Sequence, residues 1–296
     1  MTGARFMVTL AALIFIHFPM KINRSVASLF LLLLYSVLLF GQEAKSVAVM
    51  PAYSYKPDKA YFKSYWTAIK KTATGPAHWD KKEWIAFGGI VVGGAVLYIY
   101  DDPIRDFFQG HRSQSTDQIS KYGFEPWGSG LYTLPLLGGF YLYGLSAKNR
   151  KARQVALGGT QAFVMGALSV TVLKVIFGRH RPYQDDPPNP RLWTGPFGQL
   201  EYTSMPSGHT TVAFSVATVF ASVYRDKPWV GVLVYGMAGG VALSRLNDDK
   251  HWASDVFIGA ALGFAVGKTV YHIMKGHSKL SLGISDTGGI ALAYRL

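Results

Sequence analysis

Residues 206–224 read PSGHTTVAFSVATVFASVY, a short polar turn that runs directly into an apolar block. Serine is a good N-cap residue, so a helix is predicted to begin just after Ser207. Apolar blocks of the same kind, rich in aliphatic residues, glycine and aromatic residues, recur along the chain. They cover residues 84–100, 130–146, 155–177, 209–224, 228–243 and 253–273. This repetition predicts an all-α protein with six apolar helices.

The six blocks are close to the roughly 20 residues that a helix needs to span a bilayer. They predict a six-helix transmembrane bundle that forms one domain over residues 84–273. Several blocks are shorter than that length, and the mean hydropathy of the chain is only +0.17. Buried helices of a soluble bundle are therefore the alternative interpretation.

The chain of 296 residues has a formal net charge of +13. Nucleic-acid binding would place lysine and arginine on one face of a soluble domain, whereas here these residues lie between the apolar blocks. The clusters are Lys81 and Lys82; Lys148, Arg150, Lys151 and Arg153; Arg225 and Lys227; and Lys268 and Lys275. If the blocks span a membrane, all four clusters share one side, which the positive-inside rule makes cytoplasmic. We expect a multi-pass protein of a bacterial inner membrane, with no nucleic-acid partner.

Residues 1–41 have the pattern of a signal peptide or signal anchor, because a basic segment that begins at Met20 precedes a long apolar run. Met20 would begin a well-formed signal by itself, so residues 1–19 are also consistent with an extension from an upstream start codon. Residues 42–83 are predicted to be amphipathic, with an interfacial helix at 60–72 where aromatic residues alternate with lysines. A signal that delivers residue 42 outside conflicts with a first apolar block that begins inside, and the sequence leaves this topology open.

In residues 274–296, apolar and polar residues alternate on both sides of residues 285–289. Alternation of this kind is typical of a β-hairpin. We expect a short hairpin or a frayed tail there.

Three polar clusters interrupt the apolar sequence between residues 174 and 255, at block ends opposite to the basic clusters. With Asp101, Asp102 and the 101–129 loop, they are expected to face the periplasm. The clusters are Lys174 with Arg181 and Pro182; Pro206, Ser207, Gly208 and His209; and Ser244 and Arg245 with His251 and Asp255.

Lys174 and Arg181 are seven residues apart, close to two helical turns. This spacing predicts that both cations leave one helix face and hold the same anion, with Pro182 ending the helix. Arginine supplies a planar fork that can hold two phosphate oxygens. Arg179 and His180 are interpreted as loop residues. The alternative is a lysine that extends to the membrane surface and an arginine that is a surface charge.

Ser207 and Gly208 predict a phosphate cradle, because glycine lets backbone N–H groups approach an oxyanion and a helix begins there with its positive dipole end. His209, in the first turn of that helix, is placed to give a proton to a leaving group. The alternative is an ordinary helix cap followed by a histidine at the membrane edge.

His251 and Asp255 are four residues apart, so on a helix the carboxylate would reach the imidazole and fix its tautomer. The other ring nitrogen would then be a nucleophile able to form a phosphohistidine, while Arg245 clamps the phosphate. An isolated His/Asp pair is usually a structural hydrogen bond. Together, however, the clusters predict a phosphate-transfer site that needs no metal or other cofactor. The absence of cysteine excludes thiolate metal sites and disulfides.

These clusters resemble the three-part signature of the type 2 phosphatidic acid phosphatase (PAP2) superfamily, over about residues 84–273. The resemblance implies a helical bundle of the PAP2 type and metal-free hydrolysis at a membrane face. It implies that His251 is the nucleophile, His209 the acid and Asp255 the residue that orients His251. The phosphate-binding residues would be Lys174, Arg181, Ser207, Gly208 and Arg245.

The resemblance favours a membrane enzyme that removes a terminal phosphate from a lipid. The substrates considered are lipid A, undecaprenyl diphosphate, phosphatidate and phosphatidylglycerol phosphate, and the motifs do not choose among them. Two alternatives are a vanadate-dependent haloperoxidase, which would use the same residues to hold vanadate, and a non-catalytic lipid-phosphate binder or transporter. A pure binder has no use for a carboxylate-oriented histidine opposite a second histidine. The sequence does not indicate the oligomeric state.

Overall fold

A computed structural model describes residues 55–196, 201–275, 280–284 and 290–294. The predicted signal or anchor segment, residues 42–54 of the amphipathic segment and the turn predicted at 285–289 lie outside the described residues. The longer helices are α3 (Lys59–Thr74), α4 (Lys81–Ile99), α5 (Asp101–Gly110), α8 (Thr133–Ser146), α9 (Arg150–Phe177), α10 (Gly208–Val223), α11 (Pro228–Asn247) and α12 (Ala253–Lys275). The shorter elements are η1 (Gly75–His78), α6 (Gln114–Gln118), η2 (Ile119–Phe124), α7 (Glu125–Ser129) and η3 (Pro182–Gln184).

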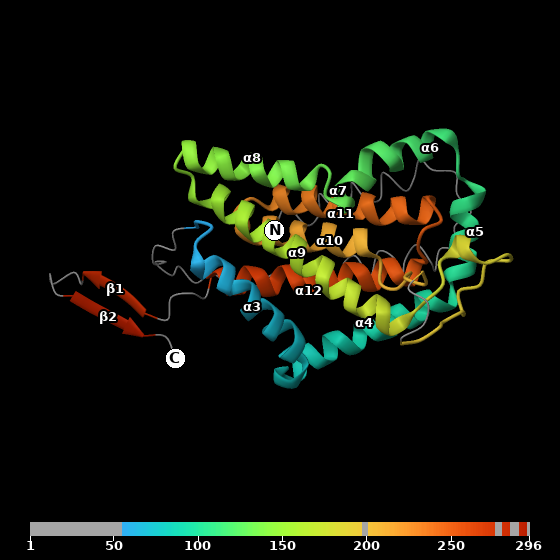
Figure 1. Cartoon of the computed structure of the whole chain (residues 1–296), viewed down its shortest axis with the longest axis horizontal. Helices are drawn as coiled ribbons and strands as arrows, with labels where there is room; N and C mark the ends of the chain where they lie inside the picture. The colour runs from blue at the N-terminus through green and yellow to red at the C-terminus, as the bar shows by residue number, and fades with distance from the viewer. Residues whose placement is uncertain (1–54, 197–200, 276–279, 285–289, 295–296) are drawn as a thin grey trace, which may run out of the picture. The chain divides into compact units, whose positions relative to one another are not determined.

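Helix α10 forms the centre of the bundle, and α9, α11 and α12 pack around it (Figure 1). Most of its 16 residues are buried, and the majority of these are apolar. A helix that is hydrophobic all round must be covered by neighbours on every face. The polar turn that precedes α10, at residues 206–207, therefore lies at one end of the core.

Helix α12 approaches α10 along a glycine stripe. A Cβ atom at Gly259 would lie 2.8 Å from the Ser207 carbonyl oxygen, and Gly263 and Gly267 are packed just as closely against the α10 backbone. Glycines four residues apart share one helix face, and Asp255 is one step further along the same series. The stripe thus places Asp255 at the beginning of α10, where its carbonyl oxygen accepts a hydrogen bond of 3.0 Å from the Ser207 N–H.

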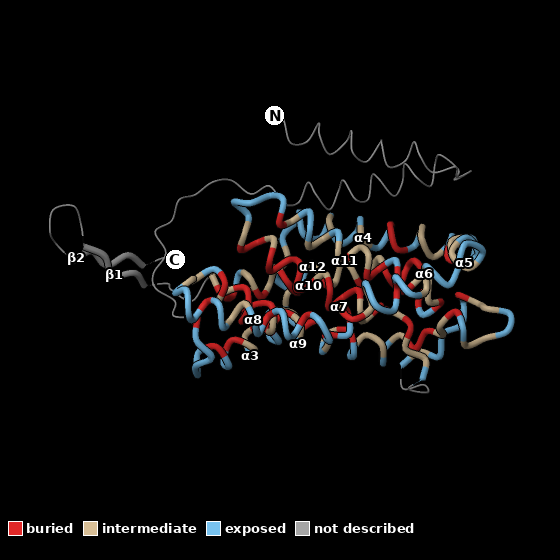
Figure 2. Tube along the Cα trace, turned by 90° about the horizontal axis from the view of Figure 1, so that it is seen from above, coloured by how far each residue is buried: buried red, intermediate tan, exposed pale blue. Residues whose placement is uncertain are grey.

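Among the residues that the structure describes, four helices are long and apolar enough to cross a membrane by length and composition: α4, α9, α11 and α12. Helix α10 is apolar but shorter. Buried residues concentrate where helices meet (Figure 2). Many large apolar side chains are nevertheless exposed. Examples are Val92, Leu142, Leu168 and Val172. Exposed apolar surface of this extent is typical of a face that contacts lipid, and the chain is a multi-pass membrane protein.

Helix α3 occupies the position predicted for an amphipathic helix at residues 60–72. Tyr61 and Ser64 are buried, and their hydroxyl groups hydrogen-bond to the Leu157 carbonyl oxygen and the Gln161 amide of α9. On the other face, Phe62 and Trp66 are exposed. One face of α3 therefore belongs to the bundle, and the opposite face is aromatic and basic.

The segment predicted as a loop at 101–129 is instead helical, containing α5, α6, η2 and α7. Its short helices escaped prediction because they lack a long apolar period. The spacing argument for Lys174 and Arg181 is also wrong, because α9 ends at Phe177, before Pro182. Gly178 caps the helix in the left-handed conformation at φ 57°, which turns the chain away from the helix axis.

The C-terminal segment contains two strands, β1 (Leu280–Ile284) and β2 (Ile290–Tyr294). They pair antiparallel, with Leu280 opposite Tyr294 and Ile284 opposite Ile290.

Candidate active site

Lys174 and Arg181 meet at one point although they do not share a helix face. The Lys174 ammonium donates a hydrogen bond to the Thr203 carbonyl oxygen, and Arg181 Nη2 donates to the Thr203 hydroxyl oxygen at 3.1 Å. Lys174 also lies beside the beginning of α10, since a Cβ atom at Gly208 would be 3.8 Å from its Cε. The buried Arg181 Nε has no hydrogen-bond partner among the described residues. Two cations thus converge on the α10 terminus, with donor capacity left for an anion.

Ser207 is the N-cap of α10, as predicted, but its side chain forms no capping bond. The hydroxyl is fully buried and accepts a hydrogen bond from Thr210, and the N–H is occupied by Asp255. The first intrahelical bond of α10 is donated by Thr211. Helix geometry leaves the N–H groups of Gly208, His209 and Thr210 without an acceptor inside the helix. These groups are the donors of the predicted cradle.

His251 and Asp255 are neighbours, but no hydrogen bond joins them. His251 precedes α12, and its Nδ1 is 3.8 Å from Asp255 Oδ2, beyond hydrogen-bond range. Oδ2 already accepts hydrogen bonds from the Ser204 hydroxyl at 2.5 Å and the Trp252 N–H at 2.9 Å. His251 Nδ1 is buried and has no partner in the described part of the chain. The structure therefore brings His251 and Asp255 close together, but the predicted hydrogen bond between them is not formed.

The pKa of His251 is lowered to about 3, first by burial of the imidazole and then by the positive charges of Lys174 and Arg181, against the opposing effect of Asp255. The ring is consequently neutral at physiological pH. A neutral imidazole has a free lone pair, which is what a nucleophile requires.

Arg179, interpreted from the sequence as a loop residue, is completely buried and lies directly behind Asp255. Its Nη1 donates to Asp255 Oδ1 at 2.6 Å, and its Nη2 donates to Asp101 Oδ2 at 2.6 Å. Ser254 links the same groups, since its hydroxyl lies 2.8 Å from Arg179 Nη1 and 2.6 Å from Asp101 Oδ2. The Pro190 carbonyl oxygen accepts two further bonds from the guanidinium.

This network brings Asp101 into contact with the third polar cluster, which confirms that both lie on one side of the bundle. Aromatic rings surround the guanidinium: its centre is 5.0 Å from the centroid of Tyr98, 4.9 Å from that of Trp193 and 5.5 Å from that of Trp252. Sequence reasoning missed Arg179 because loop arginines are usually exposed. Its one signal is the position two residues before Arg181, inside the first cluster.

His209 is the more exposed of the two histidines. Its Nε2 is 2.9 Å from Oε1 of Glu125 on α7, and about a third of each side chain is exposed. Arg245 is buried near the end of α11, where its Nη2 donates to Asp248 at 2.8 Å. Sequence reasoning missed Glu125, which lies in the segment interpreted as a loop.

Electrostatics connect the two imidazoles to one cluster of cations. The charge of Lys174 acts on both His209 and His251, and that of Arg181 acts on Lys174, Arg245 and His251. Three cations therefore act on the same small region that contains both histidines. Within the described ranges, no group of three or more histidine and carboxylate side chains could hold a metal ion.

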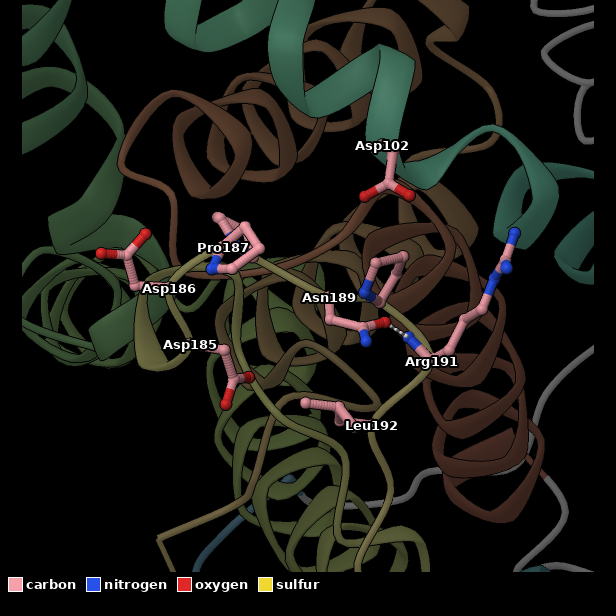
Figure 3. A pocket seen from close by; sticks show the side chains of 9 residues that line it. Asp102, Asp185, Asp186, Pro187, Asn189, Arg191 and Leu192 are labelled. Atoms are coloured by element: carbon pink, nitrogen blue, oxygen red, sulfur yellow. Dashed lines mark hydrogen bonds between the residues drawn. The ribbon is translucent and has the colours of Figure 1, made fainter.

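A separate pocket of about 500 Å³ lies at the outer surface of the loop that follows η3, with Asp102 of α5 on its other side (Figure 3). Asp185, Asp186 and Arg191 contribute its charged groups, and the Arg191 N–H donates to Asn189 Oδ1 at 2.9 Å. Three carboxylates against one guanidinium disfavour a phosphate. None of the predicted site residues lines this pocket.

A sequence model of the PAP2 superfamily matches residues 155–279, which contain all three polar clusters. A curated relative from Mycobacterium tuberculosis, a decaprenylphosphoryl-5-phosphoribose phosphatase, is 33% identical over 138 residues, 47% of this chain and 71% of the relative. The chain belongs to the PAP2 superfamily.

Two further similarities concern named lipid phosphatases. A lipid A 1-phosphatase from Porphyromonas gingivalis is 30% identical over 191 residues, which are 62% of this chain. The match spans only 37% of that protein's length. The crystal structure of a transmembrane PAP2 type phosphatidylglycerolphosphate phosphatase from Bacillus subtilis is similar with a TM-score of 0.49 and 21% identity, covering 64% of this chain and 96% of that chain.

Proposed function

We propose that this protein is a membrane phosphatase that hydrolyses a terminal phosphate ester or diphosphate of a lipid. One observation carries the proposal: a neutral, buried His251 and a partly exposed His209 are both within reach of the charge of Lys174. Cations and helix N–H groups hold the phosphate, one imidazole attacks phosphorus and the other protonates the leaving oxygen. Membership in the PAP2 superfamily supports this assignment of roles.

The reaction proceeds in two balanced steps. In the first, the free nitrogen of His251 forms a bond to phosphorus while the bond from phosphorus to the lipid oxygen breaks, and that oxygen takes a proton from His209. In the second, His209 accepts a proton from water as the water oxygen attacks phosphorus, and the bond from phosphorus to His251 breaks. Lys174, Arg181, Arg245 and the N–H groups at Gly208 stabilise the charge on the phosphoryl oxygens in both steps.

Asp255 holds the polypeptide around His251 in position. In the substrate complex, a small rotation of the imidazole would close the 3.8 Å gap to Asp255 Oδ2, which would fix the proton on Nδ1 and leave the other nitrogen for attack.

We further propose that the protein has six membrane spans in a bacterial inner membrane, with the site facing the periplasm. The positions of α8 and α10 between the four longer apolar helices support the six spans, and the lysine and arginine clusters support the orientation. A site at the membrane face can bind a headgroup whose acyl or prenyl tails stay in the bilayer. Relatives named for lipid A and for a decaprenyl-linked sugar phosphate favour a lipid-linked sugar phosphate or diphosphate substrate.

The proposal is tested by phosphate release from purified protein with lipid A, undecaprenyl diphosphate, phosphatidate and phosphatidylglycerol phosphate, each with and without EDTA. We expect release from at least one lipid, unchanged by EDTA. His251→Ala should lower turnover by at least about 10³-fold and leave lipid binding largely intact, because the covalent step is lost. The matched control is His78→Ala, since His78 is exposed on η1 and contacts only backbone.

An active His251→Ala variant would end the nucleophile assignment. Binding without release in the wild type would indicate a lipid-phosphate binder or transporter. Halide oxidation that depends on added vanadate and peroxide, without phosphate release, would indicate the haloperoxidase alternative.

A further inference from the structure

Glu125 is the carboxylate in direct contact with the proposed acid. Its Oε1 lies 2.9 Å from Nε2 of His209. Nothing in the three polar clusters predicts this contact, because Glu125 lies 84 residues before His209 in the chain. The contact belongs to the part of the fold formed by η2 and α7.

The packing of η2 and α7 holds Glu125 in place. The ring of Phe124 fills the space beside Gly240 of α11, where any added Cβ atom would overlap the ring. The Ser120 hydroxyl donates to the Ser244 carbonyl oxygen at 3.3 Å. One turn after Glu125, a Cβ atom at Gly128 would lie 2.7 Å from His209 Cβ and 2.9 Å from His209 Cδ2. The α7 backbone therefore packs directly on the histidine that Glu125 contacts.

These contacts define which edge of the imidazole faces α7. Cδ2 and Nε2 are adjacent ring atoms, and both are in contact with α7. Nδ1 is on the opposite edge of the ring and is not engaged by Glu125. With Nε2 held by a carboxylate, Nδ1 is the nitrogen left to donate to a leaving group.

The charges that act on His209 are Glu125 from α7, Arg245 from α11 and Lys174 from α9. Partial burial of the ring and its two positive neighbours disfavour a protonated imidazole. A general acid must carry its proton when the substrate binds. Glu125 supplies the negative charge that favours the protonated form.

We propose that Glu125 is a positioning residue that orients His209 and raises the fraction of it that is protonated for transfer to the leaving oxygen. This inference rests on the proposed phosphatase function. As the bond from phosphorus to the leaving oxygen breaks, its electron pair stays on that oxygen, which receives the Nδ1 proton. Glu125 remains ionised throughout and continues to accept the hydrogen bond from Nε2.

The test compares two substrates of the Glu125→Gln variant that differ in their need for an acid. Phosphatidate releases an alkoxide, which must be protonated, whereas p-nitrophenyl phosphate releases a stable phenolate. We expect kcat to fall about 10- to 100-fold on phosphatidate and less than about 3-fold on p-nitrophenyl phosphate, since general acid catalysis contributes roughly 10²- to 10⁴-fold. The alkaline limb of the phosphatidate pH profile should move to lower pH by about one unit.

Glu125→Asp keeps the carboxylate and should recover part of the phosphatidate activity. The matched control is Glu83→Gln, since Glu83 is exposed at the first turn of α4 and glutamine can keep its capping contact. Thermal unfolding in detergent verifies that each variant is folded.

Equal losses on both substrates, or no loss on either, would overturn the role of Glu125 while leaving the phosphatase proposal intact. A wild-type protein that hydrolyses neither substrate nor any lipid of the panel would overturn the phosphatase proposal itself. An alkaline limb that does not move in Glu125→Gln would show that Glu125 does not influence the protonation of His209.

Discussion

The two histidine regions of the site differ in burial and in how their charges are compensated. The His251 region is closed: Arg179, Asp101 and Asp255 are fully buried and held together by ion pairs of 2.6 Å. The His209 region is open, with about a third of the imidazole exposed and one carboxylate contact. A nucleophile benefits from a fixed, dry position, whereas an acid and base must exchange protons with substrate and water. The difference therefore matches the two proposed roles.

Breaking a buried ion pair is costly, because the charge that remains has neither a partner nor water around it. In the His251 region, Arg179 balances two carboxylates, so its loss would leave both unpaired. The His209 region depends on packing by α7. Its His209 and Glu125 side chains are partly exposed, so water can solvate their charges. We therefore expect substitutions in the first region to affect stability most.

The largest stability effect is expected for Arg179→Met. Removing one partner of a buried ion pair costs about 3–5 kcal/mol. The measurement is thermal unfolding in detergent. The control is Lys151→Met, which removes an exposed ion pair with Asp226 and should cost about 0–1 kcal/mol. Equal effects of the two substitutions would show that the buried network does not stabilise the fold.

A second prediction concerns pH. The folded pKa of His251, about 3, lies below its usual 6.5, so between these values the unfolded chain binds more protons and stability rises with pH. Lowering the pH from 6.5 to 5 should reduce the free energy of unfolding by about 2 kcal/mol through this group, at 1.36 kcal/mol per pH unit. Well above pH 6.5 the imidazole is neutral in both the folded and the unfolded chain, so this loss of stability vanishes.

This dependence is measured as the unfolding midpoint in detergent between pH 5 and 8. His251→Gln should flatten the slope over pH 5–6.5, and His209→Gln should change it less because His209 is partly exposed. A slope that His251→Gln leaves unchanged would contradict a buried, neutral His251.

The smallest effect is expected for Gly128→Ala in the His209 region. The new methyl group would lie within 3 Å of His209 and Val241 atoms, and overpacking of this kind costs about 1–3 kcal/mol. Because His209 must move to accommodate it, kcat should fall as well. The control is Gly139→Ala on α8, where an added Cβ atom contacts nothing within 4 Å. Unchanged activity in Gly128→Ala would indicate that α7 does not position His209.

Much of the fold could be predicted because its signals are local. The apolar blocks at 155–177, 209–224 and 253–273 correspond to α9, α10 and α12, whose ends differ from the predictions by a few residues. A long apolar run is sufficient to indicate such a helix. The short helices between residues 101 and 129 could not be predicted, because their stability comes from packing on α10, α11 and α12 and not from their own sequence period.

The candidate site likewise has a part that the sequence predicts and a part that only the structure reveals. The sequence determined the residue types of the proposed phosphate site, because Lys174, Ser207, His209 and His251 fall in polar clusters at the ends of apolar helices. Only the tertiary structure decided that Arg179 is buried between two carboxylates and that Glu125 contacts His209. The physical reason is that a charge partner is chosen by proximity in space, and helix packing brings together residues that are 76 to 84 positions apart in the chain.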